Sequence, residues 1–189
     1  MKKGFLIIVS APSGCGKGTI LNEILKDNKY YYSISATTRS PRPKEVDGVN
    51  YYFLSKEEFQ NKIANDEMLE YAKYCENYYG TPKKEVFDQL NNGKHVILEI
   101  EVQGAMQVKK VYPEAKLIFI APPSVNELER RLLKRGTESV EVIQERVAQA
   151  ERELSCANKY DYIIVNAELK DAIDDFKSVV RACELQVNP

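Results

Sequence analysis

The segment Ser10–Thr19, with the sequence SAPSGCGKGT, constrains the fold of this chain more than any other. It follows the apolar run Phe5–Ser10 and precedes the helical pattern Lys17–Lys26, which is the setting in which a glycine-rich loop binds phosphate. Gly14 and Gly16 let backbone N–H groups turn inward around phosphate oxygens, and the following helix N-terminus adds a positive dipole end. The alternative is a glycine-rich turn that carries a surface lysine.

The residues of this loop that we expect to bind nucleotide phosphates are Ser13, Gly14, Cys15, Gly16, Lys17, Gly18 and Thr19. Lys17 supplies a mobile positive charge for the β- and γ-phosphates. The match to G-x-x-x-x-G-K-[ST] is imperfect, because Ala11 replaces the first glycine and Gly18 stands at the hydroxyl position. Thr19 is the next hydroxyl along the chain.

The rest of the chain predicts an α/β fold, because apolar strands alternate with helices. Buried parallel strands are predicted at Phe5–Ser10, His95–Glu101, Leu117–Ala121 and Tyr162–Asn166. Helices are predicted at Lys17–Lys26, Ser124–Lys134, Val140–Cys156 and Leu169–Leu185. Ser124 and Glu127 form a capping-box pattern at the start of one of them.

Residues 35–92 interrupt this alternation and predict a small mixed α/β insertion. The segment holds two turns rich in arginine and proline, then short tyrosine-rich runs. A helix is predicted over Ser55–Asp66, with a capping box formed by Ser55 and Glu58. A second helix is predicted from Thr81, with Pro82 at its first position and Gly93 just past its end.

Two sets of polar residues in and after this insertion are typical of ligand binding. Arg39, Arg42, Tyr51 and Tyr79 offer two guanidinium groups and two phenols, which suit a monophosphate dianion. The alternative is a solvated turn.

The second set is acidic and consists of Glu70, Glu99 and Glu101. Glu99 and Glu101 are two apart on a predicted strand, so they point to one face at its C-terminal end. Carboxylates in an apolar strand are costly unless paired, and guanine presents N1–H and N2–H₂ donors on one edge. The alternative is that arginines within the protein bind these glutamates.

A third set of charges consists of Arg130, Arg131, Arg135, Arg146 and Arg152. Arg131 and Arg135 are four apart and therefore share a helical face. We expect Arg130 and Arg152 to lie on solvated faces, and one or two of the others to close over a moving phosphoryl group.

Composition excludes several classes of protein. The 189 residues suit one domain, and the net charge of −1 provides no basic field for nucleic acid or an anionic membrane. Four cysteines without a CxxC pair and a single histidine argue against metal fingers and disulfide frameworks, and favour a reducing compartment. The run FLIIV is too short for a signal peptide, so we expect a cytoplasmic protein that binds neither nucleic acid nor membrane.

Taken together, these motifs resemble the guanylate kinase family from about Gly4 to Leu185. The segments that carry the resemblance are SAPSGCGKGT, SATTRSPRPKEVDGVNYYF, NYYGTP, LEIEVQG, FIAPPS, RLLKRGTES and DYIIVN. The resemblance implies a P-loop NTPase-type parallel sheet flanked by helices. It also implies three parts: a core at 1–34, 90–126 and 155–189, a GMP-binding insertion at 35–89, and a helical lid at 127–154.

The resemblance further implies an enzyme that transfers the γ-phosphoryl group of ATP to GMP, giving ADP and GDP, with Mg²⁺ bound to ATP. The implied guanine contacts are Ser35, Glu70, Thr81 and Glu101, and the implied GMP-phosphate contacts are Arg39, Arg42, Tyr51 and Tyr79. The implied catalytic cations are Lys17, Arg39, Arg135 and Arg146, and Asn166 is an implied ATP contact. We expect no direct protein ligand to the metal ion, with Thr19 and Glu99 as candidates for contact through water, and no obligate protein partner.

Three residues depart from the family pattern. Glu101 stands where aspartate is usual, Gly18 replaces a hydroxyl residue, and Ala167 stands where an acid is common. Two alternatives to a guanylate kinase remain open. One is a catalytically silent interaction module with the same fold, which tends to lose the phosphate loop or the lid arginines. The other is a kinase for a different nucleoside monophosphate. Glu70 and Glu101 argue against it, because they favour guanine over other bases.

Overall fold

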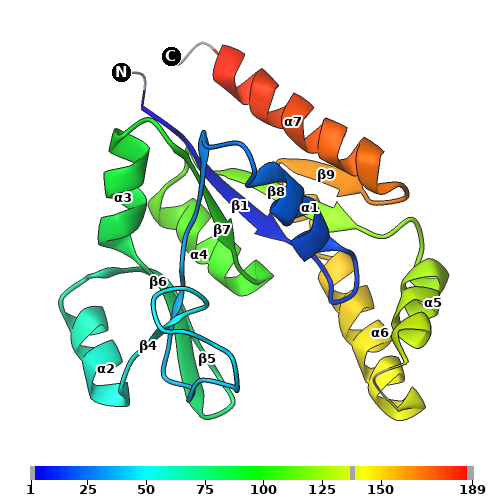
Figure 1. Ribbon diagram of the computed structural model, residues 1–189, viewed down its shortest axis with the longest axis horizontal. Coiled ribbons are helices and arrows are strands. Elements are labelled where there is room, and N and C mark those ends of the chain that lie inside the picture. The colour runs from blue at the N-terminus through cyan, green and yellow to red at the C-terminus, as the bar shows by residue number, and fades with distance from the viewer. Residues whose placement is uncertain (1–2, 137–138, 187–189) are drawn as a thin grey trace. The chain divides into compact units, whose positions relative to one another are not determined.

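The computed structural model describes residues 3–136 and 139–186, in the element order drawn in Figure 1. One sheet has five strands in the order β2-β7-β1-β8-β9, and both β2–β7 and β8–β9 are parallel pairs. Its strands are β1 (Leu6–Ser10), β2 (Tyr30–Tyr32), β7 (His95–Glu99), β8 (Lys116–Ala121) and β9 (Tyr162–Val165). Every residue of β1 is buried, which is what an apolar central strand predicts.

A second, four-stranded sheet has the order β4-β3-β6-β5. Its strands are β3 (Ala36–Thr37), β4 (Tyr52–Phe53), β5 (Met68–Tyr74) and β6 (Asn77–Pro82). β5 and β6 form an antiparallel pair, and a small core of Ala36, Phe59 and Met68 lies beneath. This sheet and two helices, α2 and α3, lie within residues 35–92, for which a mixed α/β insertion with two helices was predicted.

The helices are α1 (Lys17–Ile24), α2 (Lys56–Ala64), α3 (Lys83–Asn91), α4 (Val102–Val111), α5 (Val125–Arg135), α6 (Val140–Leu154) and α7 (Leu169–Leu185), with a short 3₁₀ turn at Ala157–Lys159. The capping box at Ser55 is present in full, and the Ser124 hydroxyl accepts the backbone N–H of Glu127 at 3.1 Å. None of the described helices combines the length and apolar composition that crossing a bilayer requires.

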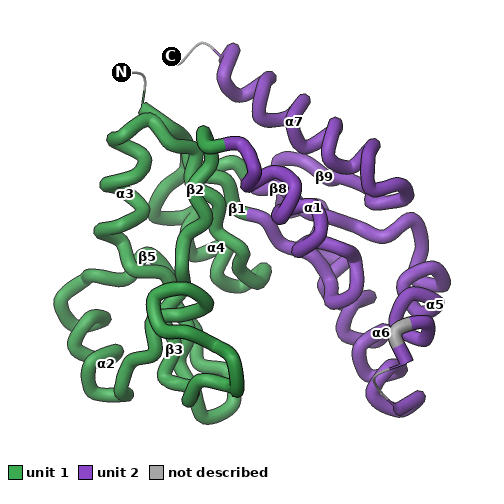
Figure 2. The backbone as a smooth tube through the Cα atoms, viewed as in Figure 1, with its two compact units in different colours: residues 1–8, 28–116 green, residues 9–27, 117–189 purple. Residues whose placement is uncertain are grey.

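The chain divides into two compact units, which Figure 2 colours separately. The first consists of residues 1–8 and 28–116, and contains the insertion together with α3 and α4. The second consists of residues 9–27 and 117–189, and contains the glycine-rich loop together with α5, α6 and α7. In this unit α1 and β9 both pack against α7.

Several predicted elements differ from the structure. β7 ends at Glu99 rather than at residue 101, and Glu101 is instead the N-cap of α4, a helix that the sequence analysis did not predict. The helix predicted from Thr81 begins at Lys83, because Thr81 and Pro82 belong to β6. The other predicted helices and strands are present. Both predicted ends of α7 are correct, and no end of the others differs by more than two residues.

Candidate active site

The glycine-rich loop joins β1 to α1 and folds as its glycines predict. Gly14 has φ +92° and Gly16 has φ +83°, a backbone region that favours glycine. A Cβ at Gly14 would stand 2.9 Å from Leu132 Cδ2, and one at Gly16 would stand 2.5 Å from Asn166 Nδ2. Both positions therefore require glycine for conformation and for space. Gly16 is the N-cap of α1 and Lys17 is the first residue of that helix.

Asn166 fixes the shape of this loop from the end of β9. Its Nδ2 donates to the backbone carbonyl of Cys15 at 2.7 Å, and its own N–H donates to the carbonyl of Ala121 at 2.8 Å. Arg131 donates to the carbonyl of Asn166 at 3.0 Å and is held in turn by Glu127 at 2.8 Å. The supporting roles of Arg131 and Glu127 were not predicted, because they depend on which carbonyl the fold brings within reach.

The Cys15 side chain is completely buried behind the loop. Burial raises the pKa of this thiol to about 12, so it stays neutral at physiological pH. Cys15 contributes its backbone to the loop and does not offer a thiolate.

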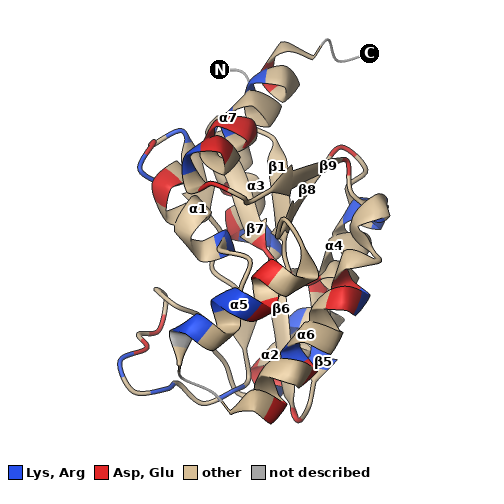
Figure 3. Cartoon of the chain, turned by 90° about the vertical axis from the view of Figure 1, so that its right-hand side faces the viewer, with Lys and Arg blue, Asp and Glu red and all other residues tan. Residues whose placement is uncertain are grey.

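Helices α5 and α6 carry acidic and basic residues interspersed, as Figure 3 shows. Arg146 on α6 donates to the Ser13 hydroxyl at 3.2 Å, so one predicted lid arginine reaches the loop. Arg130 is exposed and paired with Glu127 at 2.7 Å, as expected for a solvated face. The side chain of Arg135 lies outside the described part of the chain.

In the first unit, Glu70 is a buried carboxylate that accepts a side-chain hydrogen bond. It is 6% exposed, and the Thr81 hydroxyl donates to its Oε1 at 2.7 Å. Burial raises the pKa of Glu70 to about 7, the Thr81 hydrogen bond opposes this, and the charge of Glu101 adds to it. Two predicted guanine contacts, Glu70 and Thr81, are thus adjacent.

The predicted strand pair Glu99 and Glu101 is wrong. Glu99 ends β7, partly buried, and accepts the Tyr32 hydroxyl at 3.1 Å. Glu101 lies beyond the strand and is exposed, so the buried carboxylate in this unit is Glu70. The chain turns into α4 after Ile100, and this turn ends the strand alternation on which the prediction depended.

The predicted phosphate-binding residues gather beside β3. The Arg39 guanidinium lies 5.5 Å from the Tyr51 ring centroid, and the Tyr51 and Tyr79 rings meet edge to face at 6.2 Å. Arg39 is also paired with Glu45 at 2.9 Å, a partner that the sequence analysis did not single out. Arg42 is exposed, and its backbone N–H donates to the same carboxylate.

Ser35 stands at the edge of this group, immediately before β3. It is partly buried, and its backbone carbonyl accepts the N–H of Tyr52 at 2.9 Å. This bond fixes the backbone of Ser35 next to β4.

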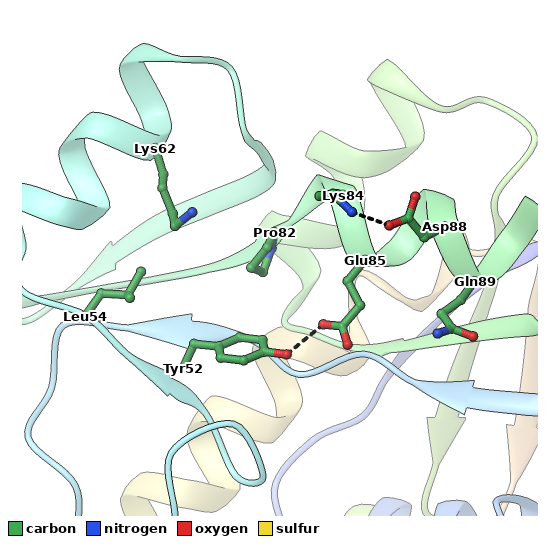
Figure 4. Close-up of a pocket in the computed structure, with 8 residues that line it drawn as sticks. All are labelled: Tyr52, Leu54, Lys62, Pro82, Lys84, Glu85, Asp88 and Gln89. Carbon is green, nitrogen blue, oxygen red and sulfur yellow. Dashed lines mark hydrogen bonds and ion pairs between the residues drawn. The ribbon is translucent and has the colours of Figure 1, made fainter.

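A cavity of about 490 Å³ lies elsewhere in the first unit, beside α3 (Figure 4). Its lining residues are Tyr52, Leu54, Lys62, Pro82, Lys84, Glu85, Asp88 and Gln89. The Glu85 carboxylate accepts hydrogen bonds from the Tyr31 and Tyr52 hydroxyls, the second at 2.9 Å. None of the predicted site residues lines this cavity, so we treat it as separate from the site.

A glycine-rich loop between a buried strand and a helix, on a sheet with parallel pairs, defines a nucleotide-binding protein of the P-loop class. The family model for guanylate kinase matches residues 3–183. The chain belongs to the guanylate kinase family.

Individual relatives agree over the full length of the chain. It is 49% identical over 188 residues to the guanylate kinase of Clostridium tetani, covering 100% of this chain and 90% of that one. It is 51% identical to the guanylate kinase of Desulfitobacterium hafniense, covering 98% and 94%. The crystal structure of guanylate kinase from Anaplasma phagocytophilum is 33% identical, with a TM-score of 0.79 and 98% and 89% covered. A shikimate kinase from Bacteroides thetaiotaomicron, 13% identical with a TM-score of 0.50, shares the fold alone.

Proposed function

We propose that this protein is a guanylate kinase that transfers the γ-phosphoryl group of ATP to GMP, giving ADP and GDP. The observation that carries the proposal is that a phosphate loop occurs in the same chain as a buried carboxylate, Glu70. Relatives about half identical over the whole chain bear the name guanylate kinase, which supports the same activity here.

On the ATP side, the loop backbone would hold the phosphates. The α1 N-terminus adds its positive dipole end, and Lys17 at its first position adds a full charge. Arg146, which already reaches Ser13, would place a guanidinium against the γ-phosphoryl group. Asn166 would act on ATP through the loop that it holds, by way of its bond to the Cys15 carbonyl.

On the GMP side, Glu70 would read the base. Its buried carboxylate would accept from guanine N1–H and N2–H₂, with Thr81 beside it and Glu101 nearby. Adenine has an acceptor at N1 and no amino group at C2, so it would offer Glu70 neither of the two donors that guanine supplies. Arg39, Arg42, Tyr51 and Tyr79 would hold the phosphate that accepts the transferred group.

Transfer needs no general base in this scheme. A monophosphate with its second pKa near about 6 is mostly dianionic at neutral pH. One of its oxygens attacks the γ-phosphorus of ATP, and the bond to the β–γ bridging oxygen breaks as ADP leaves. The protein aligns the two nucleotides and offsets their repulsion through Lys17, the loop amides and the arginines.

Magnesium would accompany ATP in this reaction. When bound to ATP, Mg²⁺ neutralises β- and γ-phosphate charge. Among the described residues no cluster of three or more His, Cys, Asp or Glu could hold a metal ion. Thr19 offers an exposed hydroxyl on the first turn of α1, and Gly18 before it offers none. This donor set fits an ion held mainly by phosphate oxygens and water, with Thr19 and Glu99 reaching it only through water.

The activity belongs in a reducing compartment such as the cytoplasm, where the four free cysteines would persist as thiols. A catalytically silent module of the same fold is disfavoured, because Gly14, Gly16, Lys17 and Arg146 are all retained. A coupled assay of ADP release tests the proposal, with GMP, dGMP, AMP, UMP and dTMP as acceptors. Release that is stimulated by GMP far more than by AMP, UMP or dTMP is expected. Release that no monophosphate stimulates would favour the silent module.

A further inference from the structure

Three N–H groups hold the carboxylate of Glu45. The two terminal nitrogens of Arg39 donate to its two oxygens at 2.9 and 3.0 Å, and the backbone N–H of Arg42 donates at 2.7 Å. The Arg39 and Glu45 side chains are only 17% and 18% exposed. The planar guanidinium of an arginine together with a backbone N–H is also an arrangement that binds a phosphate group.

Three of the five N–H bonds of the Arg39 guanidinium are used by Glu45 and Ser40. Both N–H bonds of one terminal nitrogen of Arg39 are used, by the Ser40 carbonyl at 2.7 Å and by Glu45. The other terminal nitrogen gives one N–H to Glu45. The rings of Tyr51 and Phe53, 5.5 and 5.8 Å away, restrict the plane of the group. The Nε–H and one N–H of the second terminal nitrogen lie on the other edge of the guanidinium. At the end that faces Glu45, the carboxylate and a phosphate would exclude each other.

The turn that carries Glu45 is built to present it. Lys44 has φ +77°, a conformation that residues other than glycine rarely adopt. The backbone N–H of Glu45 donates to the Arg42 carbonyl at 3.0 Å, and Asn50 accepts the N–H of Val46 at 2.9 Å. A fixed turn with a strained residue beside Glu45 distinguishes this contact from a loose surface ion pair.

We propose that Glu45 competes with the phosphate group of the incoming nucleotide for the two terminal nitrogens of Arg39, and so weakens the binding of that nucleotide. This inference rests on the proposed function, in which Arg39 binds the GMP phosphate. Binding then exchanges a carboxylate with one charge for a phosphate with two. Every ligand that uses this end of Arg39 bears the same cost of displacing Glu45, whereas guanosine, which has no phosphate, does not.

Isothermal titration calorimetry of the full chain at pH 8 with GMP and with guanosine tests this proposal. The variants are Glu45→Gln, which keeps the acceptor for Arg42, and Glu45→Ala, which removes it. Glu67→Gln is the matched control, because it also neutralises an ion-paired glutamate in the insertion, the partner of Lys62 at 3.0 Å. We expect both Glu45 variants to bind GMP about 3- to 10-fold more tightly than the wild type, by analogy with other charged hydrogen bonds. Guanosine binding and the control should be unchanged.

Weaker GMP binding by the Glu45 variants would overturn the proposal, because it would show that Glu45 orients Arg39 for the phosphate. Unchanged GMP binding, or an equal gain for guanosine, would overturn it too. All three results leave the guanylate kinase proposal standing, since GMP still binds. Wild-type protein that bound no GMP would instead refute the proposed function, and this inference with it.

Discussion

Gly104 lies against the carboxylate of Glu70, so closely that a Cβ at position 104 would stand 2.7 Å from Oε2. The missing side chain on α4 makes the room in which a buried carboxylate fits. On its other oxygen, Glu70 accepts the Thr81 hydroxyl. The base-reading group we propose is therefore enclosed by β5, β6 and α4, and its burial accounts for its raised pKa.

Replacing Glu70 with glutamine tests the reading of the base. Glutamine keeps the size but removes the charge and adds an NH₂ donor that faces guanine donors. We expect the GMP/AMP ratio of kcat/KM to fall from the range of about 10⁴ by one order of magnitude or more, with the KM for ATP almost unchanged. Glu101→Asp should be much milder, because it keeps the charge at an exposed position. A GMP/AMP ratio that survived in Glu70→Gln would mean that the base is read elsewhere.

The same substitution should stabilise the fold at high pH. The folded pKa of Glu70, about 7, lies above its ordinary value of 4.5. Between these values the unfolded chain loses its proton while the folded chain keeps it, so wild-type stability falls as pH rises. Glutamine cannot ionise, and Glu70→Gln should therefore gain up to about 3 kcal/mol over wild type at pH 8. Urea unfolding at pH 4.5, 6 and 8 measures the difference in the free energy of unfolding between the two proteins. A difference that did not depend on pH would contradict the raised pKa of Glu70.

Lys17→Met should fold normally and lose transfer activity. Removing a charge aimed at the transition state is expected to lower kcat by roughly 10²- to 10³-fold or more. The control is Lys26→Met, which neutralises an exposed lysine just beyond α1 that pairs with Glu23 at 2.7 Å. Steady-state rates at saturating ATP and GMP make the comparison. Near wild-type rates in Lys17→Met would exclude the loop from catalysis.

Gly18→Ser should restore the hydroxyl that the family pattern places in the loop. A Cβ at Gly18 would meet no atom within 4 Å, so serine fits without rearrangement. Mg²⁺ should then saturate the enzyme at a several-fold lower concentration, because one direct oxygen donor replaces a water. Steady-state rates measured at increasing free Mg²⁺ and fixed ATP compare the Mg²⁺ requirement of the variant with that of the wild type. Identical curves for both proteins would show that the metal ion does not approach this position.

Substrates should also make the molecule more compact. The residues proposed for ATP belong to one compact unit and those proposed for GMP to the other, whereas transfer requires the two phosphates to meet. Small-angle scattering with GMP and a non-hydrolysable ATP analogue should give a smaller radius of gyration than the free protein. Each nucleotide alone is the comparison. A profile that both ligands leave unchanged would indicate a preformed site.

The structural features that could be predicted from the sequence are those whose determining residues lie close together in the chain. The loop at Ser10–Thr19 was predicted correctly, because its apolar strand, glycines and helix are contiguous in the chain. Helix α4 was missed, since Gly104 and several β-branched residues weaken its pattern and its N-cap, Glu101, makes no side-chain cap. β3 and β4 contain two residues each, too few to show any alternation.

The site residues were likewise predicted only where residue type or a local pattern indicates them. Arg39, Tyr51 and Tyr79 were chosen by residue type, and the fold does bring them together. Glu45 was overlooked, although it is only six residues from Arg39, because one glutamate on a charged turn has no distinguishing pattern. Burial distinguishes Glu70 from the other two predicted acidic residues, Glu99 and Glu101. Glu70 is the enclosed carboxylate because α4 covers it, and no periodicity in β5 reveals a helix more than thirty residues away.

The bond from Asn166 to the carbonyl of Cys15 also has a consequence for synthesis on the ribosome. The loop is translated before the side chain that holds its shape, which is added 151 residues after Cys15. A nascent chain that ends before Asn166 carries every glycine of the loop but lacks the bond that fixes Cys15. The ATP half of the site is therefore completed only after Asn166 has been synthesised, so shorter nascent chains should not sequester or hydrolyse the nucleotide.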